Sequence, residues 1–250
     1  MSSAQTAPLE GRVALVVGGA GRLGREICRI LADRGAIVAV GYRGSEDAAR
    51  ALAAEIDGLA VRIDVNDDDA IDRAFARVEA ERGSVTVVVD TAHVESHPRA
   101  VADLDREFLG EHLAAVQGFA AVARRALPGM RDAGWGRFVY VSGALMSRPY
   151  AGFSAYGAAK AAATTLTRYL AAEEGRAGVT ANIVAPGRVF DPADELDETR
   201  RELSDMLLAR TALGEFPTAA QIAATVADLT TSSHLTGQTV WITGGEPIIA

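Results

Sequence analysis

The sequence predicts an α/β fold, a single domain built on a doubly wound, seven-stranded parallel sheet with helices on both faces. Two observations support this prediction. Seven short runs rich in valine and isoleucine alternate along the chain with seven longer segments of helical pattern. Several of the short runs are continuously apolar, as expected for strands that are covered on both faces. Alternation of strand and helix in this way gives right-handed crossovers and a parallel sheet.

The expected elements follow one another without an internal repeat, a low-complexity stretch or a linker. The expected strands are 12–17, 36–42, 59–64, 85–90, 136–142, 179–185 and 239–243. The expected helices are 22–34, 45–56, 67–82, 103–132, 154–175, 195–212 and 218–231. The segment 187–216 is polar and interrupted by proline, which is more typical of a flap over a site than of a domain boundary. We therefore expect a disordered tail over residues 1–8 and a single domain over residues 9–250.

The composition argues against several classes of function. The formal net charge of −8 argues against a nucleic-acid partner or an anionic membrane surface. A single cysteine, Cys28, excludes an intramolecular disulfide and a metal site made of several cysteines. The four histidines show no metal-ligand spacing, and only His93, in the loop after the fourth strand, has a suggestive position. Neither a signal peptide nor a run of about 18 apolar residues is present, so we expect a cytoplasmic protein without a membrane partner.

A glycine-rich turn, "GGAGRLG" at residues 18–24, separates the first expected strand from the first expected helix. Glycines such as Gly18 and Gly24 let backbone N–H groups approach a pyrophosphate, and the helix N-terminus favours its negative charge. The position of the turn between a strand and a helix makes a dinucleotide site the leading interpretation. A tight turn without a ligand is the alternative.

The ends of the second and third strands indicate which dinucleotide is bound. Gly41 stands where NAD-specific folds carry an acidic residue for the ribose 2′-hydroxyl, and Arg43 follows two residues later. A guanidinium without a nearby acid can bind a 2′-phosphate, so NADP(H) is favoured; a solvated loop cation is the alternative. Asp64, at the end of the third strand, stands near the expected position of the adenine ring, or else it caps the following helix.

The strongest indication of chemistry is the segment "YGAAK" at residues 156–160. Tyr156 and Lys160 stand four residues apart, so on a helix they lie on one face. Lys160 is the only lysine of the chain, since the other 24 basic residues are arginines. A lysine ammonium beside a phenol can form a proton-transfer pair and bind a ligand hydroxyl, which favours a functional role over chance placement.

These motifs together resemble the short-chain dehydrogenase/reductase family over residues 9 to 245. Further matching motifs are "DV" at 64–65, "NIVAPG" at 182–187 and "TGQTVWITGG" at 236–245. The resemblance implies a Rossmann fold and a nicotinamide cofactor. It also implies a tyrosine, Tyr156, that exchanges a proton with the substrate oxygen, and a lysine, Lys160, that lowers the pKa of the tyrosine and holds the ribose. The cofactor-binding residues it implies are Gly18, Arg22, Leu23, Gly24, Arg43, Asp64, Val65, Ala92, Tyr156, Lys160, Pro186, Gly187 and Val189.

Several positions of the family pattern carry other residues here. Arg22 replaces the middle glycine of the turn, a form similar to the pteridine-reductase branch, where this arginine faces the phosphates and the substrate. Gly143 replaces the serine that hydrogen-bonds the reacting oxygen, and the adjacent Ser142 reaches the site only if the chain bends after the strand. Ala115 replaces the asparagine that supports a water chain below the lysine. Asp191 replaces a threonine that commonly binds the nicotinamide carboxamide.

The catalytic tetrad implied by the resemblance is therefore degenerate. Besides Ser142, the missing hydrogen-bond donor could be Ser147, Tyr150, a water or a hydroxyl of the substrate. After the fourth strand, "DTAH" at residues 90–93 also stands where the family usually has N-N-A-G.

These features predict an NADP(H)-dependent oxidoreductase that transfers a hydride to or from a carbonyl or alcohol of a small to medium organic substrate. Two alternatives remain open because of the altered tetrad. One is a non-redox reaction such as dehydration, isomerisation or cyclisation, and the other is a dinucleotide-binding sensor. We also expect a homo-oligomer, a tetramer or a dimer, because relatives of this fold pair the long helices that correspond to 103–132 and 154–175.

Overall fold

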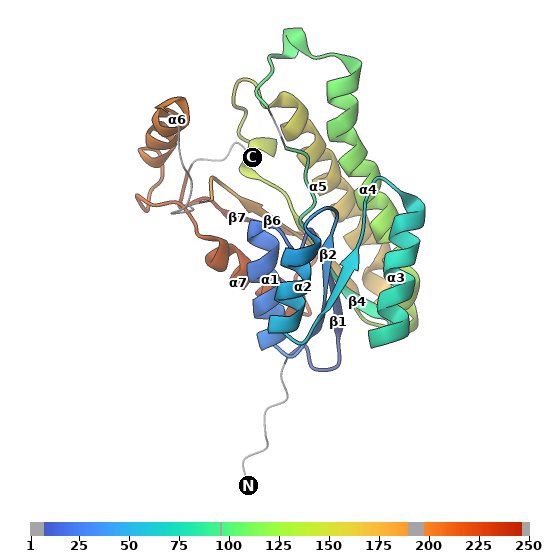
Figure 1. Cartoon of the computed structure of the whole chain (residues 1–250). Helices are drawn as coiled ribbons and strands as arrows, with labels where there is room; N and C mark the ends of the chain where they lie inside the picture. The colour runs from blue at the N-terminus through green and yellow to red at the C-terminus, as the bar shows by residue number, and fades with distance from the viewer. Residues whose placement is uncertain (1–7, 96, 190–197, 247–250) are drawn as a thin grey trace.

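The computed structural model describes residues 8–95, 97–189 and 198–246, and it confirms the predicted fold class (Figure 1). All strands pair in parallel, in the order β3-β2-β1-β4-β5-β6-β7. The strands are β1 (Val13–Val17), β2 (Ile37–Tyr42), β3 (Leu59–Arg62), β4 (Val85–Asp90), β5 (Gly136–Val141), β6 (Val179–Pro186) and β7 (Thr239–Ile242). The predicted tail over residues 1–8 lies outside the described residues except for Pro8, and Leu9 already belongs to the core.

Helices cover both faces of the sheet, which makes the fold doubly wound. One face packs against α1 (Arg22–Asp33), α2 (Glu46–Glu55) and α7 (Ala219–Thr231). The opposite face packs against α3 (Asp68–Arg82), α4 (Arg106–Asp132) and α5 (Ser154–Glu174). The remaining helix, α6 (Glu198–Leu208), lies to one side of these layers (Figure 1). Short 3-10 helices are η1 (Val101–Asp103), η2 (Ala144–Met146) and η3 (Gly175–Ala177).

The core has one hydrophobic cluster on each face of the sheet, because the continuously apolar strands contribute side chains to both. On the α4 side, the ring of Phe119 meets the edges of Phe138 and Tyr140 at centroid distances of 5.3 and 5.2 Å. Burial of each such ring contributes about 1.5–3 kcal/mol. This packing fixes α4 and α5 beside β4 and β5, where the predicted tyrosine and lysine lie.

Side chains in the sequence determine where the helices begin. Asp105 accepts a hydrogen bond from the N–H of Phe108 at 2.7 Å, which starts α4 a few residues later than predicted. Thr218 and Gln221 form a reciprocal capping box at the start of α7. In the described part of the chain, no helix combines the length and the hydropathy of a membrane span.

The strand order reverses direction between β1 and β4. The chain leaves β1 for β2 on one side, and after β3 it crosses back to β4 on the other. The loops that follow β1 and β4 therefore diverge, and an open crevice forms at the carboxyl ends of these strands. The place where the strand order reverses is called the topological switch point, and in this fold class ligands bind there.

Candidate active site

A cavity of about 790 Å³ opens at the switch point. Its volume is within the usual range of small-molecule sites. The loops after β1, β2, β3, β4, β5 and β6 contribute to its lining, together with α4 and α5. The predicted site residues in this lining are Gly18, Arg22, Leu23, Gly24, Arg43, Val65, Ala92, Ser142, Tyr156, Lys160, Pro186, Gly187 and Val189.

The glycine-rich turn forms one wall of the cavity and leaves no room for side chains. Gly18 has a φ of 76°, and a Cβ there would lie 2.5 Å from the hydroxyl oxygen of Thr91. A Cβ at Gly24 would collide with the carbonyl oxygen of Gly18. Helix α1 then begins without a side-chain cap, since Gly21 stands at its N-cap. The turn and the open helix end therefore form a backbone cradle that fits a phosphate or pyrophosphate group.

The end of β2 lies beside this cradle. A Cβ at Gly41 would lie 2.7 Å from the carbonyl oxygen of Val16. The close approach of β1 therefore excludes any acidic side chain at this position. Arg43, two residues later, is exposed and lines the same cavity.

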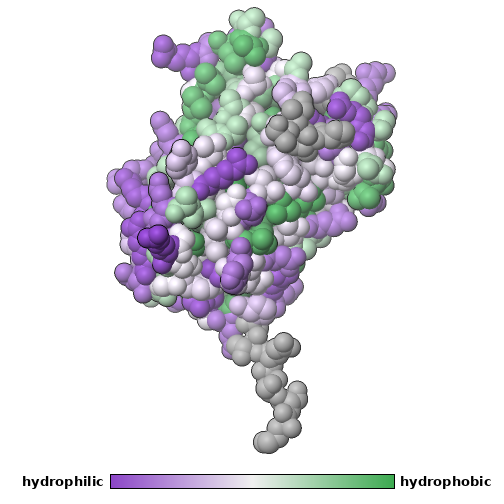
Figure 2. All heavy atoms as spheres, turned by 180° about the vertical axis from the view of Figure 1, so that it is seen from behind, coloured by the Kyte–Doolittle hydropathy of each residue, from purple (hydrophilic) through white to green (hydrophobic). Residues whose placement is uncertain are grey.

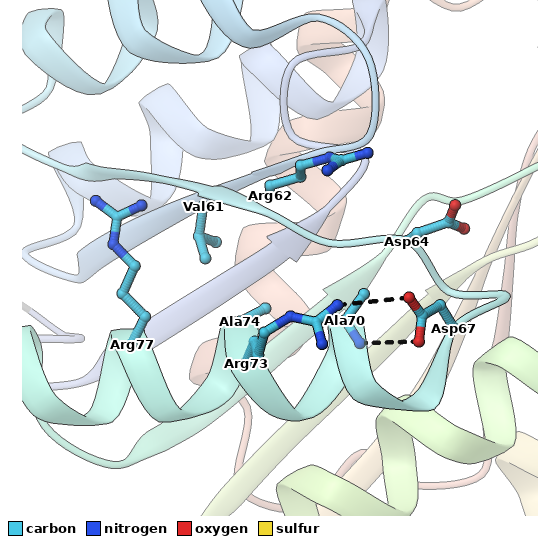
Figure 3. A pocket seen from close by; sticks show the side chains of 8 residues that line it. All are labelled: Val61, Arg62, Asp64, Asp67, Ala70, Arg73, Ala74 and Arg77. Carbon is cyan, nitrogen blue, oxygen red and sulfur yellow. Dashed lines mark hydrogen bonds and ion pairs between the residues drawn. The ribbon is translucent and has the colours of Figure 1, made fainter.

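Asp64 differs from the other predicted cofactor residues. Asp64 lines a second cavity of about 240 Å³. Figure 3 shows this cavity, which is also lined by Arg62 of β3 and by Arg73 and Arg77 of α3. The carboxylate of Asp64 accepts a hydrogen bond from the N–H of Asn66 at 3.1 Å. The alternative role of Asp64 as a helix cap is wrong, because Asp67 caps α3 by accepting from the N–H of Ala70 at 3.1 Å. Val65 and Asn66 line the larger cavity in place of Asp64.

Tyr156 and Lys160 lie on one face of α5, as their spacing predicts. The ammonium of Lys160 is buried and donates a hydrogen bond to the carbonyl oxygen of Val141 at 2.9 Å. Its nitrogen is 5.7 Å from the ring centroid of Tyr156 and 4.9 Å from that of Tyr140. The end of β5 thus holds the only lysine of the chain between two tyrosine rings.

Burial has the largest influence on the pKa values of Tyr156 and Lys160. It lowers the pKa of Lys160 to about 8, although the nearby carboxylate of Asp90 acts in the opposite direction. Burial raises the pKa of Tyr156 to about 12. The resemblance implied that the lysine lowers the pKa of the tyrosine, whereas in the protein without a cofactor the loss of solvation prevails. The phenol is accordingly held in its protonated, proton-donating form at neutral pH.

The space next to Tyr156 matches the position of the missing serine. A Cβ built at Gly143 would lie 3.2 Å from the hydroxyl oxygen of Tyr156. The adjacent Ser142 donates to the sulfur of Met146 and the carbonyl oxygen of Lys160, and it accepts from the hydroxyl of Thr164 at 3.0 Å. A donor role for Ser142 requires its hydroxyl to leave these partners, and this role stays a prediction. Neither of the other two candidate donors, Ser147 and Tyr150, belongs to the lining of the cavity.

Asp90, the first residue of "DTAH", is buried directly before Thr91 of the cavity lining, and the sequence did not assign it a role. It ends β4, and its carboxylate accepts a hydrogen bond from the N–H of Ala92 at 2.9 Å. Burial raises the pKa of Asp90 to about 6, which the Ala92 bond and the charge of Lys160 only partly oppose. In the sequence, the only indication of this role was an acidic residue, Asp90, at the end of a valine-rich strand.

The end of β6 and the residues after it contribute Pro186, Gly187 and Val189 to the lining of the cavity. The guanidinium of Arg22 reaches across from α1 toward the carbonyl oxygen of Val189 at 3.5 Å. Asn182 of the "NIVAPG" motif is buried away from the cavity and bonds to the backbone of Leu235 and Gln238. The asparagine thus holds β6 to the segment before β7. The predicted departure at Asp191 lies outside the described residues.

Exposed hydrophobic side chains gather near the end of the molecule where α4 begins. Val101 is 72% exposed and Leu113 is 38% exposed. Figure 2 shows hydrophobic surface at the top of the molecule, the end at which Figure 1 places the start of α4. Neither Val101 nor Leu113 belongs to the lining of the 790 Å³ cavity.

Comparison with known proteins identifies relatives over almost the whole chain. A family model described as enoyl-(acyl carrier protein) reductase matches residues 19–246. The 3-oxoacyl-(acyl-carrier-protein) reductase FabG of Pseudomonas aeruginosa is 32% identical over 244 residues, which cover 95% of this chain and 98% of that protein. The cis-4-hydroxycyclohexanecarboxylate dehydrogenase of Sinomonas cyclohexanicum is 33% identical over 243 residues, or 94% of this chain and 96% of the dehydrogenase.

A solved structure shows the same fold. The gluconate 5-dehydrogenase of Burkholderia cenocepacia, in complex with NADP and tartrate, superimposes with a TM-score of 0.87. It is 24% identical in sequence, and the match covers 96% of this chain and 97% of that chain. The family model covers residues 19–24 of the glycine-rich turn and the Tyr156–Lys160 pair. This chain belongs to the short-chain dehydrogenase/reductase family.

Proposed function

We propose that the protein is an NADP(H)-dependent oxidoreductase that transfers a hydride to or from a carbonyl or alcohol of a small to medium organic molecule. The observation that carries this proposal is the composition of the 790 Å³ cavity. A glycine cradle for phosphates, the exposed Arg43 and the buried pair of Tyr156 and Lys160 all line it. A bound nicotinamide cofactor would supply or accept the hydride.

The preference for NADP(H) over NAD(H) rests on the end of β2. Close packing excludes an acid at Gly41, and the Arg43 guanidinium can bind a 2′-phosphate. The similar gluconate 5-dehydrogenase was solved with NADP, which agrees with this preference. Gly18, Arg22, Leu23, Gly24, Val65, Ala92, Pro186, Gly187 and Val189 would form the rest of the cofactor site. We do not assign Asp64 to it.

Tyr156 would donate a proton to the substrate oxygen during reduction and accept one during oxidation. Because burial raises its pKa, the phenol is protonated at neutral pH and has a proton to give when the substrate oxygen becomes negatively charged. Lys160 would stabilise the resulting phenolate by its positive charge. The open space at Gly143, beside the phenol oxygen, is where the reacting oxygen would lie.

The relatives indicate a class of substrate. Their names give a 3-oxoacyl group on a carrier protein and a hydroxycyclohexanecarboxylate as substrates. Both contain a carbonyl or hydroxyl on an apolar carbon frame. We therefore propose a partly apolar ketone or secondary alcohol.

The second candidate function is a non-redox reaction or dinucleotide sensing on the same scaffold. It is favoured by Gly143, because loss of the serine donor typically costs about 10²–10³ in rate. Ala115 favours it too, since the asparagine of the relay is absent. This candidate retains the cofactor site and predicts binding of the dinucleotide without hydride transfer.

We also propose that the chain forms a homo-oligomer through α4 and α5, a dimer or a tetramer. Two apolar side chains of α5, Leu166 and Tyr169, are 37% and 62% exposed. Isologous pairing of these helices would cover them. Light scattering at micromolar concentration tests this proposal, and a 26.1 kDa species alone would contradict it.

The test of the proposed function has two steps. Calorimetric titration with NADPH and NADH measures binding, and absorbance at the nicotinamide band then measures turnover against a panel of ketones and alcohols. We expect tighter binding of NADPH and turnover of at least one partly apolar substrate. Tight binding of NADPH without turnover of any substrate favours the second candidate, and binding of neither dinucleotide contradicts both.

A further inference from the structure

His112 lies on α4, one helical turn before Ala115, where the family has its asparagine. Its side chain is 2% exposed, and its ring packs against that of Phe108 with centroids 4.7 Å apart. The Nδ1 atom lies 2.9 Å from the carbonyl oxygen of Phe108. Because a carbonyl oxygen can only accept a hydrogen bond, Nδ1 carries a proton. In the neutral ring, Nε2 is therefore the atom with a lone pair.

This Nε2 atom is buried and has no hydrogen-bond partner among the described residues. Buried polar atoms in such positions normally bond to an ordered water. A small cavity adjoins the ring, and Ala115, Tyr140, Tyr156 and Lys160 line it together with His112. About 10 Å³ of this cavity is open to the centre of a water molecule, which is room for about one water.

We propose that His112 replaces the missing asparagine as the residue that holds a water against Lys160 and exchanges protons with it. This inference rests on the proposed oxidoreductase function. Helices α4 and α5 lie side by side (Figure 1), so the cavity between them has His112 on one wall and Lys160 on the other. Ala115 has only a methyl group, which leaves the space of an asparagine side chain to the water and the imidazole. Three residues apart on α4, His112 and Ala115 face the same cavity.

The proton balance of this relay is simple. During reduction, Tyr156 gives its proton to the substrate oxygen, and the pair of Tyr156 and Lys160 is then one proton short. An imidazolium at His112 restores it: Nε2–H passes a proton to the water as the water passes another to Nζ of Lys160. The imidazole becomes neutral and regains a proton through the same water from the large cavity, whose lining shares Ala92, His93, Val94 and Ala115 with that of the small cavity. During oxidation the same transfers run in reverse, and the proton leaves through His112.

Other titratable groups face this cavity from the neighbouring elements. They are Tyr140 from β5, Tyr156 and Lys160 from α5, and His93 from the loop after β4. Asp90 is buried at the end of β4 and interacts electrostatically with Lys160 and Tyr140. Its carboxylate favours a positive charge within the cluster. The negative charge of Asp90 therefore stabilises the proton that Lys160 and His112 exchange.

The first test measures kcat with NADPH and a substrate found in the panel. His112→Ala should lower kcat by about 10- to 100-fold. This loss is smaller than that for a direct general acid, which is about 10²–10⁴-fold. The solvent isotope effect on kcat should increase. Adding Ala115→Asn to His112→Ala should restore most of kcat, because the family's water-binding amide then returns. Glu111→Gln changes an exposed residue of α4 that lines neither cavity, and it should behave like the wild-type protein. Unchanged kcat and isotope effect in His112→Ala would overturn the relay.

The second test needs no turnover. Nitrogen NMR of the full chain with labelled histidine should show His112 as the Nδ1–H tautomer in its neutral form. The chemical shift of its Nε2 atom should change in Lys160→Met, since the two residues share a water in our proposal. An Nε2 signal that is identical in the two proteins would overturn the relay even if the enzyme is active. Absence of turnover in the wild-type protein would count against the proposed function instead, and the NMR result would still decide the relay.

Discussion

The two ends of the large cavity differ in how they are built. The cofactor end, after β1 and β2, combines a backbone cradle with the side chains of Arg22 and Arg43, and glycine is required in the cradle by close contacts such as that of Gly18 with Thr91. The catalytic end, between β5, α4 and α5, consists of side chains. Here Tyr156 and Lys160 keep the family pattern, but neighbouring positions carry Gly143 and Ala115.

The difference shows which parts of a site can change. A backbone cradle tolerates few substitutions because any side chain would fill it. A side-chain network can lose one member if another group takes over its hydrogen bond, as we propose for His112. The four predictions below test this contrast, and the largest effects are expected at the catalytic end.

Tyr156→Phe should cause the largest loss. The substitution removes the hydroxyl that donates the proton and keeps the ring that packs in the site, so kcat should fall by about 10²–10⁴-fold. Steady-state kinetics with NADPH measures this loss, and calorimetry should find cofactor binding little changed. Tyr169→Phe is the matched control, since Tyr169 lies on the same helix and is 62% exposed. Near-normal kcat in Tyr156→Phe would exclude the phenol as the acid.

Lys160→Arg should cost about 10²-fold in kcat, the scale of a misplaced reacting group. A guanidinium keeps the charge but is larger and planar, and it cannot make the same single bond to the carbonyl oxygen of Val141 in this buried position. The control is the reverse substitution Arg168→Lys on an exposed face of α5, which should leave kcat unchanged. Circular dichroism should show both variants folded. Wild-type rates in Lys160→Arg would mean that only the charge matters.

The fold and the cofactor end were predictable because their signals are local. The alternation of valine- and isoleucine-rich runs with helical patterns predicted the seven strands, and the spacing of Tyr156 and Lys160 placed them on one face of a helix. The roles of Asp90 and His112 could not be predicted, because they depend on β4 and α4 meeting α5 in space. Asp64 lines the smaller cavity, whereas its neighbours Val65 and Asn66 line the larger one. One residue at a strand end decides which of two cavities a side chain faces.

Arg43→Ala tests the cofactor end. Loss of the guanidinium should weaken NADPH binding by about 10- to 100-fold, or ~1.5–3 kcal/mol, and leave NADH binding nearly unchanged. Calorimetry with both dinucleotides measures the difference. Arg25→Ala, an exposed arginine of α1 outside the cavity lining, is the control. Gly41→Asp is unsuitable as a test, since a Cβ there would collide with β1. Equal affinities for NADPH and NADH in the wild-type protein would falsify this prediction.

The smallest expected effect concerns Asp90 and appears in stability. The pKa of Asp90 is raised from 3.8 to about 6, so the folded protein binds this proton more tightly than the unfolded chain does. Its stabilising contribution is fully present below pH 3.8 and is lost as the pH rises through about 6. Asp90→Asn keeps an oxygen for the N–H of Ala92 but cannot ionise, so the variant should avoid this loss.

The stability of Asp90→Asn relative to the wild-type protein should therefore rise between about pH 4 and pH 6 and stay constant above it. The gain at pH 7 should be at most about 3 kcal/mol, and smaller because Lys160 loses a favourable neighbour. Denaturant unfolding of both proteins at pH 4.5 and pH 7 measures the difference, and the titration of all other carboxylates cancels in it. A difference that does not change with pH would show that Asp90 is not held in a perturbed state. A gain at pH 7 accompanied by lower kcat would show that the catalytic end keeps this buried charge for Lys160 at the expense of stability.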